Sequence, residues 1–251
     1  MEPDPTPMAE PPTLPSLDAG VTLLASDGRT TGALQSLVLD HLLLSDGGCL
    51  WVDADGHATT TSLADLAPSR RTLDRIRVAR AFTAFQHYGL VGTLPEATGP
   101  GTSLLVAPAV DRFYAADDLH AGEGETMLDG ALETLGELAA ARDLPVLVTR
   151  HDPRGLGRRV AERCDETLEC TRTRFGPRFS GDGFETLVYD RPGGGVQTTL
   201  AFWRRVLLRR HRHAVGAAGA AGTADGADAI RETDGTATSE EPLGVTTGGA
   251  D

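Results

Sequence analysis

Two carboxylates close the second apolar run of the chain, and their type and spacing suit acid–base chemistry. Asp53 and Asp55 lie at the end of the run that begins at Cys49, just before Gly56. Two neighbouring carboxylates can divide the roles of acid and base between them, and α/β sheets place their sites where strands end. The alternative is structural, because Asp-x-Asp-Gly is also typical of a solvated acidic turn. The residues alone leave both interpretations open.

Arginines gather in three groups in the second half of the chain, and they suit the binding of phosphate. The groups are Arg150, Arg154, Arg158, Arg159 and Arg163; Arg172, Arg174 and Arg178; and Arg204, Arg205, Arg209, Arg210 and Arg212. Phe175 and Phe179 lie within the second group, where rings between arginines could stack on bases. The candidates for a nucleic-acid face are Arg154, Arg158, Arg159, Arg172 and Arg174. The alternative is that these groups neutralise the acidic C-terminal tail or pair with acidic residues across the fold. Gly155 and Gly157 indicate a flexible loop within the first group.

Histidine and cysteine do not indicate a metal or nucleophile site. The seven histidines show no H-E-x-x-H pattern, and no G-x-S-x-G segment is present. The three cysteines are Cys49, Cys164 and Cys170, which lack the second ligand pair of a zinc site. We therefore expect no metal, and we expect Cys49 to be a small core residue.

The charge balance is strongly acidic, with 36 acidic residues and a net charge of −13. All 23 basic residues are arginine, and this lysine-free acidic composition resembles that of proteins from salt-loving archaea. At molar salt the Debye length is about 3 Å, so acidic self-repulsion is screened and a nucleic-acid partner is not excluded. No apolar run approaches the roughly 20 residues of a membrane span, and the first residues do not resemble a signal peptide. We expect a cytoplasmic protein without membrane contact.

Short apolar runs alternate with helical patterns in the middle of the chain, which predicts an α/β fold with a mainly parallel sheet flanked by helices. The expected strands are 21–25, 49–53, 75–79, 103–107 and 145–149. The expected helices are 31–44, one from about 82, and 125–142. Segments 166–173, 184–190 and 196–202 alternate apolar and polar residues, which predicts an antiparallel C-terminal extension. Segment 202–213 is either a strand end or a short basic helix.

The composition divides the chain into three parts. Residues 1–17 are rich in proline and acidic residues, and residues 214–251 contain almost no large apolar side chain. Such segments cannot bury enough surface to fold, so we expect disordered ends. The folded domain is predicted at 18–213.

The order of the strands resembles the archaeal RadA recombinases and their paralogues among the RecA-type ATPases. The most specific match is Arg-Ile-Arg-Val-Ala-Arg-Ala-Phe at 75–82, followed by Gln86 and His87. The other matching segments are 20–24 at the strand entering the nucleotide loop, 49–56 at the strand ending in Asp-Thr-Glu-Gly, 103–107 at the Walker B strand, and 145–151 at the strand ending in Val-Thr-Asn-Gln. The resemblance covers roughly residues 20–190 and implies a RecA-like domain, in which Asp55 stands for the glutamate that orients the attacking water.

The nucleotide-binding loop departs from the family pattern. Where the Walker A loop has G-x-x-x-x-G-K-[ST], this chain has Ala-Ser-Asp-Gly-Arg-Thr-Thr-Gly at 25–32. Thr31 replaces the lysine that bridges the outer phosphates, and Gly32 replaces the hydroxyl that holds Mg²⁺. The residues of this vestigial site are Asp27, Gly28, Arg29, Thr30, Thr31, Asp53 and Asp55. The segment is either an altered nucleotide or anion pocket, in which Arg29 could reach a phosphate, or a turn kept for folding.

The metal-orienting carboxylate is also displaced. After the apolar run 104–106 the chain continues Ala-Pro-Ala, and the first acid is Asp111. Losing both the lysine and this carboxylate removes most of the electrostatic stabilisation that phosphoryl transfer needs. We therefore expect no catalytic residues and no bound ATP cofactor.

The resemblance then implies a non-catalytic accessory or regulatory factor in DNA recombination or repair. Its partners would be a RecA-type recombinase or another protein, and single-stranded DNA. One alternative is a regulatory module similar to the KaiC branch of the superfamily, without a DNA role. Another is an enzyme with an altered nucleotide pocket around Arg29, Asp53 and Asp55.

Overall fold

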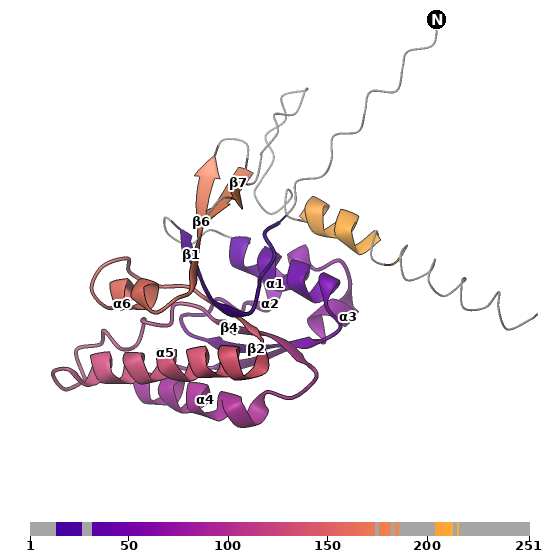
Figure 1. Ribbon diagram of the computed structural model, residues 1–251. Coiled ribbons are helices and arrows are strands. Elements are labelled where there is room, and N and C mark those ends of the chain that lie inside the picture. The colour runs from indigo at the N-terminus through magenta and orange to yellow at the C-terminus, as the bar shows by residue number, and fades with distance from the viewer. Residues whose placement is uncertain are drawn as a thin grey trace, which may run out of the picture. The chain divides into compact units, whose positions relative to one another are not determined.

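The chain folds as an α/β arrangement around one mainly parallel sheet (Figure 1). The computed structural model describes residues 14–26, 32–173, 176–181, 184–185, 204–212 and 215. Within them the strands are β1 (Gly20–Ser26), β2 (Gly48–Asp53), β3 (Ile76–Arg80), β4 (Thr102–Ala107), β5 (Pro145–Val148), β6 (Glu166–Thr173), β7 (Gly176–Gly181) and β8 (Phe184–Glu185). Their order across the sheet is β3-β2-β4-β5-β1-β6-β7-β8.

The antiparallel extension begins one strand later than the sequence pattern suggests. Strand β6 pairs parallel with β1 on one side and antiparallel with β7 on the other. Strand β8 is antiparallel to β7. The predicted mainly parallel sheet with an antiparallel C-terminal extension is therefore confirmed, and β6 joins the two parts. The expected strand at 196–202 lies outside the described residues.

Helices cover both faces of the sheet and create two apolar cores. The helices are α1 (Ala33–Leu44), α2 (Thr60–Leu66), α3 (Arg70–Leu73), α4 (Ala84–Ala97), α5 (Glu123–Arg142) and α6 (Leu156–Glu162). One core joins α1 and α2 to Trp51 and Val106 of the sheet. The other joins α4 and α5 to Val52 and Val146. Neighbouring strand residues thus point to opposite faces, as both-sided burial in a parallel sheet requires.

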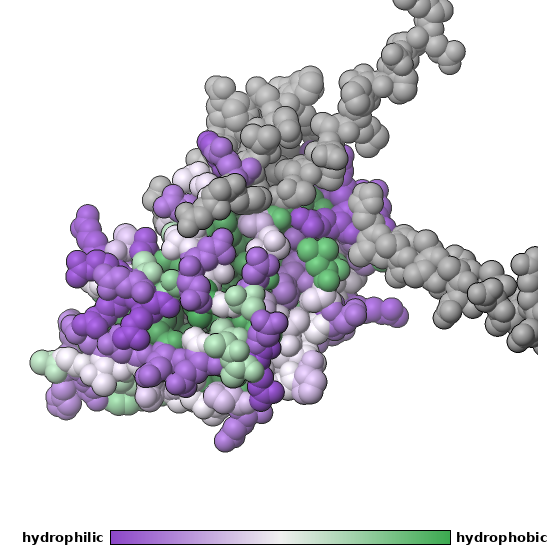
Figure 2. Space-filling model, in the orientation of Figure 1, coloured by the Kyte–Doolittle hydropathy of each residue, from purple (hydrophilic) through white to green (hydrophobic). Residues whose placement is uncertain are grey.

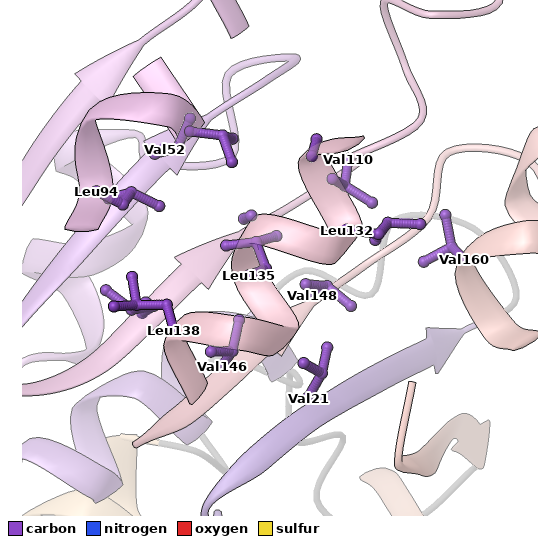
Figure 3. Packing of buried hydrophobic residues seen from close by; sticks show 14 of the residues in the cluster. Val21, Val52, Leu94, Val110, Leu132, Leu135, Leu138, Val146, Val148 and Val160 are labelled. Carbon is purple, nitrogen blue, oxygen red and sulfur yellow. The ribbon is translucent and has the colours of Figure 1, made fainter. Parts of the chain in front are cut away.

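Helix α5 shows how the sequence pattern becomes packing. Leu128, Leu132 and Leu135 are buried and lie on one side of the helix at spacings of three and four residues. Figure 3 shows Leu132 and Leu135 of α5 among the valines Val146 and Val148 of β5. Full burial of each such leucine contributes about 1.5–3 kcal/mol. The outer surface is more polar than this core. Figure 2 shows hydrophilic side chains over most of the drawn face, with apolar ones among them.

Both ends of the folded part pack on the α1 side of the sheet. Leu14 and Leu17 are buried there, so the packed chain reaches back to residue 14 rather than beginning at 18. Residues 204–212 form a helix, which decides between the two interpretations of segment 202–213. Within the described ranges, no helix is both long and apolar enough to cross a membrane.

The chain divides into two units at Ala214. The first covers residues 1–214 and the second residues 215–251. Of the second unit only Val215 belongs to the described residues.

Helix α4 carries a buried histidine on its inner side. His87 is fully buried, and its Nδ1 is 2.7 Å from the hydroxyl oxygen of Tyr114. The rings of these residues meet edge to face, with centroids 5.4 Å apart. Its Nε2 is buried and finds no partner among the described residues. Burial lowers the pKa of His87 from 6.5 to about 4, because the charged imidazolium would lose its hydration.

This burial predicts acid sensitivity that depends on one residue. The folded pKa of His87 lies below the unfolded value of 6.5, so its contribution to stability is full above pH 6.5 and is lost as pH falls towards 4. We expect the difference in unfolding free energy between the wild type and His87→Gln to shrink by up to about 3 kcal/mol between pH 7 and 4. Chemical denaturation across this range measures it, with exposed His120→Gln as the control. A difference that does not change with pH would contradict the prediction.

Candidate functional site at the carboxyl edge of the sheet

The carboxyl ends of β2, β4 and β5 meet where the chain changes faces. Strand β2 leads into α2 on the α1 side, whereas β4 leads into α5 on the opposite side. In open α/β sheets the crevice at such a switch point is where ligands bind. The loops that follow these three strands carry Asp55, Arg112 and His151, which lie together at this edge.

Asp53 is a structural residue of this edge. Its side chain is fully buried, and its Oδ1 accepts hydrogen bonds from the backbone N–H groups of His57 at 2.8 Å and Ala58 at 3.0 Å. Its Oδ2 forms an ion pair with Arg80 Nε at 2.8 Å. Arg80 lies opposite Asp53 in the β2–β3 register and also donates to the carbonyl of Ala58 at 3.0 Å. Asp53 therefore closes the 54–58 turn, and the interpretation of this segment as a solvated turn is wrong for Asp53 itself.

Asp55 lies at the carboxyl edge of the sheet, between the side chains of Arg112 and His151. Its Oδ1 is 3.7 Å from Arg112 Nε, and its Oδ2 is 4.0 Å from His151 Nδ1. Its backbone has a φ of 64°, and Gly56 follows at 71°. Aspartate tolerates this left-handed conformation better than most residues, so an Asp-Gly pair suits the turn. The carboxylate is 29% exposed, and nearby positive charge offsets its own.

Asp111 connects the ends of β4 and β5. It is almost fully buried, and its carboxylate accepts from the backbone N–H of His151 at 2.5 Å and of Asp152 at 3.3 Å. Thr149 adds a second connection, because its hydroxyl oxygen accepts from Ala109 N at 2.7 Å. Asp111 follows the Walker B-like strand by more residues than the family's carboxylate does. Its side chain is therefore directed at the backbone of the loop after β5.

The segment after β5 is ordered, which corrects the expectation of a flexible loop. Residues 156–162 form helix α6. Gly157 is needed for the close approach, because a Cβ there would overlap the carbonyl oxygen of Asp152 and lie 3.1 Å from Asp111 Oδ2. Gly155 has a φ of 48° at the start of the helix. These glycines permit a tight turn rather than movement.

The arginines predicted as a nucleic-acid face divide into two kinds. Arg159 is an internal partner of α5, with distances of 2.6 Å to Glu125 and 2.9 Å to Asp129. Arg163 lies 3.7 Å from Asp129 as well. By contrast, Arg154 is exposed, and the side chain of Arg158 is 77% exposed, with one ion pair among the described residues, 3.7 Å from the exposed Glu162. Exposed pairs of this kind contribute little.

Several predicted residues fall outside the described ranges. These are Asp27, Gly28, Arg29, Thr30, Thr31 and Arg174. The backbone of Arg172 belongs to β6, in register with Pro177 of β7. Gly32 directly precedes α1 as its N-cap with a φ of 94°, and its carbonyl accepts from Ser36 N at 2.8 Å and from the Ser36 hydroxyl at 2.5 Å.

Sequence reasoning did not find Arg80 and Arg112. The pairing of Arg80 with Asp53 depends on the register of β3 beside β2, which a single sequence does not reveal. Arg112 follows Asp111 directly in the sequence, and this adjacency was the one available signal. Among the described side chains, no group of three or more His, Cys, Asp and Glu could hold a metal ion.

No family model matches the chain, and no match is found among curated proteins.

The Asp111 connection predicts a local loss of stability. In Asp111→Asn one oxygen becomes an NH₂ group, which would face a backbone N–H donor and leave it unsatisfied. We expect a loss of about 1–3 kcal/mol in unfolding free energy. Amide hydrogen exchange should also speed up at His151 and Asp152. The exposed substitution Asp118→Asn is the matched control, and unchanged exchange in Asp111→Asn would show that the connection is dispensable.

Proposed function

We propose that this chain is a non-catalytic RecA-type protein that serves as an accessory or regulatory factor in DNA recombination or repair. The observation that carries the proposal is how the three aspartates at the carboxyl edge are used. Asp53 bonds to a turn and to Arg80, Asp111 bonds to two backbone N–H groups, and Asp55 lies between Arg112 and His151.

The arrangement of the strands supports the RecA-type part of the proposal. The segments that resemble the nucleotide-loop strand, the Walker B strand and the strand of Asp55 are β1, β4 and β2. All three are parallel members of one sheet and end at the same edge. A nucleotide site in a RecA-type domain requires that convergence, so the scaffold is compatible with the resemblance.

The chemistry of the edge supports the non-catalytic part. Phosphoryl transfer needs groups that hold Mg²⁺ and spread the developing charge. Asp53 and Asp111 are buried with their oxygens directed at protein donors, so neither is oriented towards a solvent-borne metal. An altered pocket built on Asp53 is disfavoured for the same reason.

The proposal predicts that the protein does not turn over ATP. In about 1 mM Mg-ATP we expect phosphate release at the level of the buffer and no rise in melting temperature. Asp55→Ala and Arg29→Ala should behave as the wild type does. Turnover that disappears in Asp55→Ala would overturn the non-catalytic function, and stabilisation by nucleotide that disappears in Arg29→Ala would favour the altered-pocket enzyme.

One observation favours the alternative of a KaiC-like regulatory module without a DNA role. Arg159 and Arg163 bind acidic side chains of α5, so part of the first arginine group is not available to DNA. Arg154 and Arg158 are the exposed members on which a DNA face at this edge would depend.

Binding to single-stranded DNA separates the two functions. If the edge contacts DNA, Arg154→Gln/Arg158→Gln should lower affinity several-fold and reduce the slope of log K against log salt by about 1.4. Fluorescence anisotropy at several salt concentrations measures both quantities. Arg71→Gln/Arg142→Gln, which removes the same charge from exposed positions, is the control. A wild type that binds no DNA at low salt would favour the regulatory module.

A further inference from the structure

The last described helix, residues 204–212, is fixed to the fold by its inner side (orange in Figure 1). Val206 and Leu207 are buried in the core that contains α1. Arg210 points to the same side, with Nε 2.8 Å from Asp40 Oδ1 and a hydrogen bond of 3.3 Å from its guanidinium to the carbonyl of Leu14. The inner side thus contains two apolar anchors and one partly buried ion pair, which together set the orientation of the helix.

The outer side carries the remaining arginines of the helix. Arg204, Arg205 and Arg212 are exposed, Arg209 is half-buried, and Leu208 is 37% exposed. At 3.6 residues per turn these five positions fall within an arc of about 140°, opposite Val206, Leu207 and Arg210. We call Arg204, Arg205, Arg209 and Arg212 the arginine stripe. Among the described residues, none of the four forms an ion pair with an acidic side chain.

The composition of the stripe indicates the kind of partner. The centre of a protein–protein interface combines arginine with several apolar or aromatic side chains, whereas Leu208 is the one apolar residue on this side of the described helix. Guanidinium groups match phosphate in a two-point geometry and stay charged at all physiological pH. The stripe is about 12 Å long, and duplex DNA presents about seven phosphate charges over that length.

We propose that the arginine stripe binds the phosphate backbone of nucleic acid, using a helix surface separate from the carboxyl edge of the sheet. The inference rests on the proposed DNA role and names a surface for it. Because phosphate contacts carry no sequence information, binding through the stripe is independent of base sequence.

Substitution of the stripe tests this directly in the full chain. The variant Arg204→Gln/Arg205→Gln/Arg209→Gln/Arg212→Gln keeps the inner anchors Val206, Leu207 and Arg210. The charge-matched control is Arg70→Gln/Arg71→Gln/Arg77→Gln/Arg142→Gln, which removes four positive charges from exposed positions elsewhere. Anisotropy titrations use a labelled single-stranded oligonucleotide and its duplex at several salt concentrations. Circular dichroism and melting confirm that the variants are folded.

The expected result is a loss of affinity of at least tenfold in the stripe variant, with a salt slope lower by about 3 to 4, and little change in the control. Equal binding by the wild type and the stripe variant would overturn the inference and leave the DNA role intact. Equal losses in both variants would also overturn it, since net charge alone would then decide binding. A wild type that binds no nucleic acid would overturn the DNA role as well.

Competition by polyglutamate identifies the class of partner. Polyglutamate is added until its carboxylate charges equal the phosphate charges of the oligonucleotide in concentration. Displacement of the oligonucleotide would overturn the inference in favour of an acidic protein partner. Little displacement supports a phosphate ligand. If the fourfold variant does not fold, Arg205→Gln/Arg212→Gln replaces it, with an expected reduction of the salt slope by about half as much.

Discussion

Buried carboxylates that accept hydrogen bonds from the backbone hold the carboxyl edge of this sheet in place. A charge removed from water is costly unless donors surround it, so each such aspartate imposes a conformation on the loop that supplies the donors. Asp53 imposes the 54–58 turn and binds Arg80 across the β2–β3 pair. Asp111 draws the backbone of residues 151 and 152 to the end of β4, and Gly157 leaves room for that approach.

The same constraint decides what this edge can do. A carboxylate that orients Mg²⁺ must turn oxygens towards the solvent and the metal shell, whereas a carboxylate that organises a loop turns them towards N–H groups. In Asp53 and Asp111 both carboxylate oxygens are directed at donors of the protein itself. On the proposed function, the residues near the former metal position have become part of the scaffold, and only Asp55 stays at the rim beside Arg112 and His151.

Much of the fold follows from local pattern, and most of the site does not. The apolar runs of β1, β2, β4 and β5 and the leucine spacing of α5 identify those elements, because burial on one or both faces leaves a periodic signal. Helix α6 is different, because Gly155 and Gly157 at its start suggest a loop, although Gly157 permits close packing against Asp152 and Gly155 adopts a positive φ before the helix. Arg80 is a partner of Asp53 only through strand register, a non-local property that composition and spacing do not encode.

Positive charge in this protein is concentrated in local groups of arginine within a chain of negative net charge. The binding of a polyanion therefore depends on these local surfaces more than on the net charge. With a net charge of −13, a polyanion is repelled at long range, so binding requires cations gathered where a ligand can contact several at once. Arg159 and Arg163 form ion pairs with acidic side chains of α5, and Arg210 forms one with Asp40, so these three are less available to bind a ligand. Burial raises the pKa of Asp40 to about 6 while Arg210 opposes the shift, so the pair is a fully charged clamp only above that pH. The inner arginine thus fixes the helix, and its neighbours on the outer side keep their charge for a ligand.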